Sequence, residues 1–146
     1  MTKTTKMWKC GKCGKEYTSE EFIRLPSVPL VPEDKNPMEQ HGYTPVCKCG
    51  YVFHRDRWHL VSKVKLRECV VKVSTIFLEL NHGFGDEDLW YETMIFSDKP
   101  EIECYFCERY KTKQEAIKGH KRIVKLLKEC KYEIKPIKFE LKLKES

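Results

Sequence analysis

Two pairs of closely spaced cysteines stand in the first third of the chain. Cys10 and Cys13 are separated by two residues, and Cys47 and Cys49 by one. Two thiolates joined by so short a turn can bind one zinc ion. We therefore predict a four-cysteine zinc site, although the single residue between Cys47 and Cys49 makes the second turn tighter than usual. Four protein ligands leave no open position for water, so the role of this zinc would be structural.

Other ligand sets remain open at this stage. His54 or His59 could replace one cysteine of the second pair, or one pair could simply be buried. Cys104 and Cys107 form a third pair without a second pair after it, so they could also be strand-edge thiols or a disulfide. A second metal there would need a ligand from elsewhere in the chain. The residues that could supply it are Cys69, His82, His120 and Cys130.

The loop at 81–88 is a further candidate for chemistry. It contains His82, two glycines and three acids, and such groups can act as a general base or hold a divalent metal. A hydrolase or nuclease would need His82 and Asp86 to meet Glu92 and His120. The competing interpretation is a hairpin loop with solvent-facing acids. His120 falls on the apolar face of an expected helix, which favours a buried, hydrogen-bonded histidine.

The composition indicates a folded, unexported protein. Of the 146 residues, 40% are hydrophobic and 34% charged, which is typical of globular chains. No apolar run approaches the roughly 18 residues of a membrane span, and no apolar segment follows the lysine-rich start. We therefore expect a cytoplasmic protein with no membrane partner. Paired cysteines in a reducing compartment are metal ligands more often than disulfides.

The net charge of +6 is unevenly distributed. Residues 108–146 carry thirteen Lys or Arg against six Glu, whereas residues 83–103 carry seven acids against one lysine. A basic surface of this kind can contact the phosphates of nucleic acid, although polarised charge can also serve solubility alone. The residues predicted to bind nucleic acid are Lys9, Lys12, Lys15, Arg55, Arg57, Lys118, Lys121, Arg122, Lys125 and Lys128.

The cysteines belong to a predicted first domain, residues 1–57, that resembles a zinc ribbon. Glycines beside the cysteines are expected to supply positive backbone angles. Residues 25–45 contain five of the seven prolines, so we expect a long surface loop with neither helix nor strand. A short strand is expected at residues 51–54.

Residues 58–146 are predicted to form an α+β domain, in which one amphipathic helix packs on an antiparallel sheet. Alternating or β-branched apolar residues predict the strands, and the capping pattern that begins at Thr112 predicts a helix of about eighteen residues. The final alternating segment follows Pro136, which favours an edge strand. The expected strands are 58–67, 70–80, 89–96, a short one within 102–110, and 137–144, with the helix at 112–130.

Short motifs occur in a fixed order along this domain. They are Val73 to Leu78, His82 to Gly85, Glu92 to Phe96, and then Tyr110, Thr112, Glu115-Ala116 and Gly119-His120. This order resembles a family of small phage and prophage proteins that has no assigned activity, over about residues 73–120. The resemblance implies a viral source and a location in the host-cell cytoplasm. It also places His82, Glu92 and His120 within the family's motifs.

Together these features predict a small zinc-binding accessory protein, of viral origin, that binds nucleic acid through a basic surface. One alternative is an adaptor whose polarised surface and proline-rich loop engage a host or viral protein. The other is the small metal-dependent hydrolase or nuclease described above.

Overall fold

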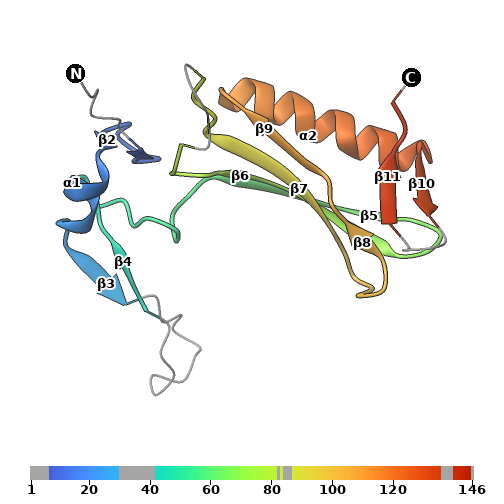
Figure 1. The fold of residues 1–146 in the computed structure, drawn as a ribbon, viewed down its shortest axis with the longest axis horizontal. Helices are drawn as coiled ribbons and strands as arrows, with labels where there is room; N and C mark the ends of the chain where they lie inside the picture. The colour runs from blue at the N-terminus through green and yellow to red at the C-terminus, as the bar shows by residue number, and fades with distance from the viewer. Residues whose placement is uncertain (1–6, 30–41, 82, 84–86, 136–139, 146) are drawn as a thin grey trace. The chain divides into compact units, whose positions relative to one another are not determined.

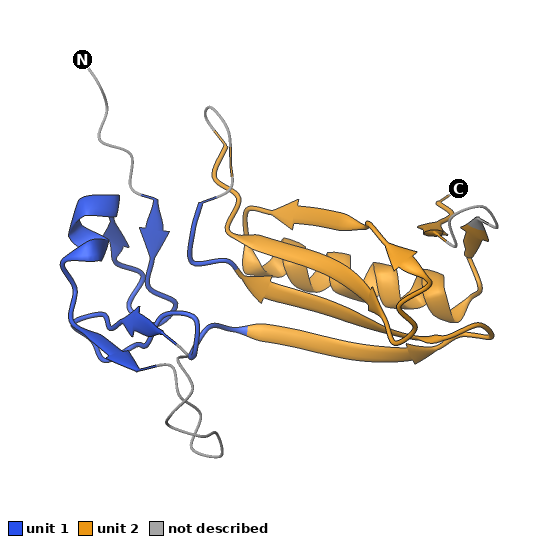
Figure 2. Ribbon diagram, turned by 60° about the horizontal axis from the view of Figure 1, so that its bottom comes forward, with its two compact units in different colours: residues 1–58, 78–81 blue, residues 59–77, 82–146 orange. Residues whose placement is uncertain are grey.

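The chain folds into two compact units, shown in different colours in Figure 2. Unit 1 consists of residues 1–58 and 78–81, and unit 2 of residues 59–77 and 82–146. The computed structural model describes residues 7–29, 42–81, 83, 87–135 and 140–145. Each unit is described by itself below.

A four-stranded antiparallel sheet forms the centre of unit 2, and one helix, α2, covers one of its faces (Figure 1). Neighbouring strands follow the order β5-β6-β7-β9. The predicted α+β fold, with an antiparallel sheet and one packed helix, is confirmed. The strands are β5 (His59–Lys65), β6 (Val70–Phe77), β7 (Tyr91–Ser97) and β9 (Cys107–Tyr110), and α2 is Lys113–Lys128.

Alternation along the strands separates a buried face from an open one. On β6, Val71, Val73 and Phe77 are buried, whereas Lys72 between them is exposed. Because successive side chains of a strand point to opposite faces, this two-residue period assigns one face to the core beneath α2. The opposite face, called the open face below, carries Lys63, Lys72 and Phe96 in one cross-strand row.

Helix α2 begins at the predicted N-cap. The Thr112 side chain accepts a hydrogen bond from the Glu115 N–H at 3.2 Å. The Glu115 carboxylate accepts from the Lys111 N–H instead of completing a capping box with Thr112. The helix has 16 residues and ends at Lys128, slightly earlier than predicted, and Cys130 beyond it has a φ of 59°. Its buried side chains are Ala116, His120, Ile123 and Leu127.

A second, small sheet in unit 2 corrects one prediction. Its order is β10-β11-β8, so the final alternating strand β11 lies in the middle rather than at an edge. β11 pairs antiparallel with β10 on one side and parallel with β8 on the other. Residues 137–139 of the predicted strand lie outside the described residues. The strands are β8 (Glu103–Cys104), β10 (Tyr132–Lys135) and β11 (Glu140–Leu143).

The described part of unit 1 contains two small hairpins and one short helix. The β3-β4 hairpin lies at the two ends of the proline-rich segment, so the prediction of no strand there is wrong at those ends. Residues 30–41 between them lie outside the described part. The elements are β1 (Trp8–Lys9), β2 (Glu16–Tyr17), α1 (Ser19–Ile23), β3 (Ser27–Pro29) and β4 (Tyr43–Pro45).

Aromatic packing gives unit 1 a small core. Phe22 from α1 stacks on Trp8 with ring centroids 3.9 Å apart and meets Phe53 edge-on at 4.9 Å. Tyr51 also meets Phe53 edge-on, at 5.2 Å. The strand expected at 51–54 is reduced to one bridge, between Val52 and Val46, because the backbone turns at His54, where φ is 67°.

A buried chain of hydrogen bonds joins α2 to the sheet. Tyr110 donates to Thr93 at 3.0 Å, and the hydroxyl groups of Thr93 and Thr75 lie 2.5 Å apart. His120, only 2% exposed, completes the chain: Nδ1 lies 2.8 Å from Thr75 Oγ1, and Nε2 lies 2.8 Å from Ser62 Oγ. The interpretation of His120 as a buried, hydrogen-bonded residue is confirmed. If the hydroxyl protons run from Tyr110 towards Nδ1, the neutral imidazole carries its proton on Nε2.

This network makes the stability of unit 2 depend on pH. Burial lowers the pKa of His120 from its usual value of 6.5. A depressed folded-state pKa contributes stability that is present above the unfolded pKa and lost as the pH falls through the folded pKa. We therefore expect the free energy of unfolding of unit 2, measured by denaturant titration, to decrease as the pH falls from 7.5 to 5. His120→Gln should reduce the change in unfolding free energy with pH. His59→Gln, which replaces an exposed histidine, should leave that change as it is in the unmodified protein. Equal slopes in all three proteins would contradict the assignment.

Candidate metal centre

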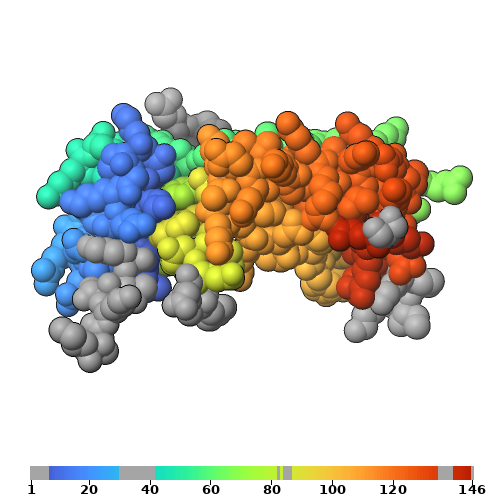
Figure 3. Space-filling view, turned by 90° about the horizontal axis from the view of Figure 1, so that it is seen from above, coloured from blue at the N-terminus to red at the C-terminus, as the bar shows by residue number. Residues whose placement is uncertain are grey.

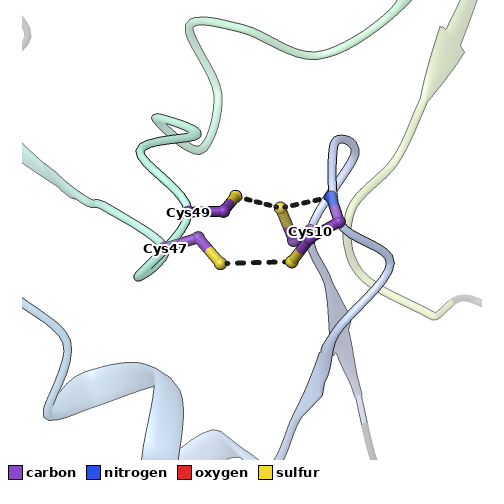
Figure 4. A group of neighbouring side chains, drawn as sticks. Cys10, Cys47 and Cys49 are labelled. Carbon is purple, nitrogen blue, oxygen red and sulfur yellow. Dashed lines mark hydrogen bonds between the residues drawn. The ribbon is translucent and has the colours of Figure 1, made fainter.

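The four predicted cysteine ligands meet at one point of unit 1. The sulfur atoms of Cys10, Cys13, Cys47 and Cys49 all lie within 4.8 Å of one another. Cys10 Sγ lies 3.4 Å from Cys49 Sγ, and Cys13 Sγ lies 3.6 Å from Cys47 Sγ. Figure 4 shows sulfur atoms from two separate segments turned towards one another. With zinc–sulfur bonds of about 2.3 Å, the sulfurs of a tetrahedral site lie about 3.8 Å apart, so the group fits a metal ion with little adjustment.

The first cysteine pair occupies the turn between β1 and β2. The Cys10 carbonyl accepts from the Gly14 N–H at 3.1 Å, and its sulfur accepts from the N–H groups of Lys12 and Cys13, each at 3.4 Å. Gly14 has the positive φ expected for such a turn, 77°, but Gly11 does not. Gly11 instead allows a close approach, because a Cβ there would lie 2.8 Å from the Tyr51 hydroxyl.

The second pair also occupies a closed turn, despite its one-residue spacing. The Cys47 N–H donates to the Tyr51 carbonyl, and the Gly50 N–H donates to the Cys47 carbonyl, both at 2.8 Å. Gly50 has a φ of 97°, a conformation that other residues rarely adopt. The positive backbone angle that closes this turn therefore lies immediately after the second ligand, so one intervening residue is sufficient.

The environment shifts the pKa values of two of the cysteines in opposite directions. Burial raises the pKa of Cys10 to about 12. Burial also opposes ionisation of Cys47, but the Cys49 backbone N–H and the Tyr17 hydroxyl stabilise its thiolate and lower its pKa to about 6. The Tyr17 oxygen lies 2.9 Å from Cys47 Sγ. A cation bound between the sulfurs would replace the protons that they otherwise share.

A buried carboxylate supports both turns, and the sequence interpretation missed it. Glu79 is fully buried, and burial raises its pKa. Its carboxylate accepts from the Tyr51 hydroxyl at 2.5 Å and from the His54 N–H at 2.9 Å, while its carbonyl accepts from the Lys9 N–H at 2.8 Å. Glu79 thereby connects the strand before Cys10 to the residues that follow Cys49.

The alternative ligands do not join this group. Among the described residues, the four cysteines form the only cluster of three or more possible metal ligands. His54 Nδ1 lies 3.3 Å from the Glu79 carboxylate, and Cys107 donates to Glu92 at 3.3 Å. All eight cysteines are free, so Cys104 and Cys107 form no disulfide. Burial and the neighbouring Cys69 raise the pKa of Cys104 to about 11.

The proposed catalytic set is not assembled in the described residues. His120 faces Thr75 beneath α2, whereas Glu92 accepts from Arg109 on the open face at 2.9 Å. Since Glu92 and Thr93 are consecutive in β7, their side chains point to opposite faces of the sheet. Glu92 and His120 are therefore separated by the sheet. His82 and Asp86 lie outside the described residues.

The ten predicted nucleic-acid-binding residues divide evenly between the units. Several are held in ion pairs: Lys9 with Glu16, Arg55 with Asp56, Arg122 with Glu108 and Glu145, and Lys125 with Glu129. On α2, Lys118, Lys121 and Lys128 are exposed and form no ion pair with another described residue. The unit 1 residues are Lys9, Lys12, Lys15, Arg55 and Arg57, and the unit 2 residues are Lys118, Lys121, Arg122, Lys125 and Lys128.

Fold and site together define a small α+β protein whose four-cysteine group can hold a metal ion. No protein-family model matches the chain, and comparisons with curated proteins and with solved structures likewise gave no match. Within the described residues, no helix is long and apolar enough to cross a membrane.

Proposed function

We propose that the four-cysteine group binds a structural zinc ion and that the protein is an accessory factor that binds nucleic acid. Four thiolates select zinc over hard, oxygen-preferring cations such as Mg²⁺. With every position of the tetrahedron filled by protein, the ion would stabilise unit 1 rather than activate water. The resemblance to phage and prophage proteins suggests a viral source, and the nucleic-acid role rests on the charged surface beside α2.

The observation that carries the nucleic-acid proposal is a groove beside α2. It has a volume of about 430 Å³ and is lined by three lysines of the helix, together with Ser62, His120, Val124 and Glu129. We call it the α2 groove. Lys121, Lys125 and Lys128 are spaced by four and three residues, so they follow one side of the helix. Figure 3 views the molecule from the side of α2, whose side chains (orange) are at the front of unit 2.

The charge of the α2 groove suits a phosphate backbone. Glu129 is its only lining acid among the described residues, and it lies 3.9 Å from Lys125 and 3.4 Å from Lys131. The ion pair between Lys125 and Glu129 is exposed, and exposed ion pairs contribute little to stability. Lys125 can therefore exchange Glu129 for a phosphate at little cost. Lysines bind phosphates as point charges, so this groove would hold a nucleic-acid backbone without reading its sequence.

Salt-dependent titration tests the proposal. We expect the metal-analysed protein to bind a fluorescent oligonucleotide more weakly as salt rises, because each phosphate contact releases counterions. Replacing Lys121, Lys125 and Lys128 with alanine should make the slope of log K against log salt less steep by roughly 2. Each phosphate contact with a single strand contributes about 0.7 to that slope. The matched control replaces Lys99, Lys111 and Lys113, three exposed lysines outside the groove, and should leave the slope nearly unchanged.

Two results would contradict this function. Affinity that does not change between low and physiological salt would exclude binding through phosphates. Absence of binding at low salt would instead favour a protein partner for the polarised surface, with zinc retained as a structural ion.

A further inference from the structure

The α2 groove is the first of three hollows, and each shares one lining lysine with the next. A second hollow, of about 300 Å³, is lined by Lys128 from α2 and by Lys63, Lys65 and Arg67 along and just beyond β5. A third, of about 400 Å³, shares Lys63 with the second and lies over Lys72 and Phe96 on the open face. Successive hollows thus meet at a shared lysine, and we call the series, from α2 past the β5 edge to the open face, the basic track.

Cations predominate along the whole basic track. Besides Glu129, its only acid among the described residues is Asp98, whose carboxylate accepts from the Val70 N–H at 2.9 Å. The sheet order ends at β5, so the track passes around a strand that has no neighbour on its outer side in this sheet. The cations that line the track are Lys121, Lys125, Lys128, Arg67, Lys65, Lys63 and Lys72.

Two lysines face each other directly on the open face. Lys63 and Lys72 are cross-strand partners on β5 and β6, and neither forms an ion pair with another described residue. Like charges directly opposite each other destabilise a sheet. A bound anion between the two ammonium groups would turn this repulsion into attraction.

An exposed aromatic ring continues the same cross-strand row. Phe96 on β7 pairs with Lys72, is 45% exposed, and has its ring centroid 5.1 Å from Lys72 Nζ. An aromatic ring beside cations is the arrangement on which unpaired bases stack while their phosphates are neutralised. Phe96 thus adds a contact for a base to the phosphate contacts made by the lysines.

We propose that the basic track binds single-stranded nucleic acid, which passes around the β5 edge and stacks one base on Phe96. This inference rests on the proposed binding at the α2 groove and adds the form of the nucleic acid and its path. A duplex is stiff over about 150 base pairs, so it cannot bend sharply around the edge of one strand. A single strand can make this bend, and its bases are free to stack.

The test compares binding of a fluorescent oligothymidine 20-mer and of a 20-base-pair duplex to the 146-residue chain. We expect the single strand to bind more tightly. Phe96→Ala should weaken its binding about tenfold, within the range measured for the loss of one stacked base, and should leave the salt slope unchanged because no charge is removed. Phe96→Tyr should restore the affinity. Replacing Lys63 and Lys72 with alanine should make the slope of log K against log salt less steep by roughly 1.4.

Val61→Ala is the matched control, since Val61 is also on the open face and is 44% exposed but does not line the track. It should leave affinity unchanged. Normal binding by Phe96→Ala, together with the reduced salt dependence of the variant in which Lys121, Lys125 and Lys128 are alanine, would overturn the inference while leaving the proposed function intact. Equal binding of duplex and single strand would overturn it too. No binding of either probe by the unmodified protein would refute both proposals.

Discussion

Replacing Cys47 with serine is expected to unfold unit 1 while the β5-β6-β7-β9 sheet of unit 2 remains folded. Among the described residues, the buried cluster of unit 1 has six members, and two of them are the ligands Cys10 and Cys47. So small an apolar core rarely supports a fold without a metal or disulfides, and unit 1 has no disulfide. Structural zinc sites contribute on the order of 10 kcal/mol in small peptides, so the loss should exceed the stability of the unit.

Hydrogen exchange, combined with metal analysis, measures this effect. The N–H groups of Cys10, Cys47 and Gly50, which donate to backbone carbonyls in the two turns, should lose protection in Cys47→Ser. The amides of β6 should retain it. Addition of a strong chelator to the unmodified protein should produce the same pattern, because removal of the ion and removal of one ligand both open the site.

Cys130→Ser is the control for this experiment. Cys130 is an exposed free cysteine outside the four-cysteine group, so its replacement should change neither metal content nor protection. A protein that contains no zinc as isolated, and whose unit 1 resists the chelator, would show that the cysteines pack as thiols. In that case the Cys47→Ser substitution should cost only a few kcal/mol, as for other buried residues.

The metal ligands could be predicted because each pair is a local pattern, whereas Glu79 could not. Spacing within Cys10–Cys13 and Cys47–Cys49 is sufficient to indicate a shared ion. Glu79 reaches Tyr51 and His54 only through long-range folding, and a glutamate after a β-branched strand has no local signature of burial. Its function becomes visible only once residues 78–81 are found in unit 1.

Two other differences have separate causes. Helix α1 was not predicted, although its signal is present: Thr18 and Glu21 form a complete capping box. The helix has only five residues, too short for an apolar period to show. The final strand was wrongly placed at an edge because alternation determines which face is buried but not which strands become neighbours. The pairing of β11 with β8 joins segments separated by more than thirty residues.

The motifs behind the resemblance converge in the buried network of unit 2. Thr75, Thr93, Tyr110, Gly119 and His120 come from three strands and α2, and they meet where the helix crosses the sheet. Glu92 from the same motifs lies on the other face, paired with Arg109. The buried motif residues therefore have a structural explanation in the attachment of α2, on which the position of the α2 groove depends.

Gly119→Ala is expected to destabilise unit 2 by about 2 to 3 kcal/mol, the upper range for overpacking. On an open helix surface the same change would stabilise by up to about 1 kcal/mol, because glycine is a poor helix former. At Gly119, however, a Cβ would lie 2.5 Å from ring carbons of Tyr110 and closer still to its hydroxyl oxygen. Tyr110 is 7% exposed and donates to Thr93, so its ring cannot turn away without breaking the network.

A double-mutant cycle isolates this contact. Chemical denaturation of Gly119→Ala, Tyr110→Ala and the double variant should give strong coupling, since the alanine methyl group meets no ring once Tyr110 is shortened. Lys118→Ala, at the neighbouring exposed position of α2, should change stability by less than about 0.5 kcal/mol. If Gly119→Ala instead stabilises the protein, α2 can move outward without loss. The close contact between helix and sheet would then not be required, and the lysines of the α2 groove would not be held at a fixed distance from β5.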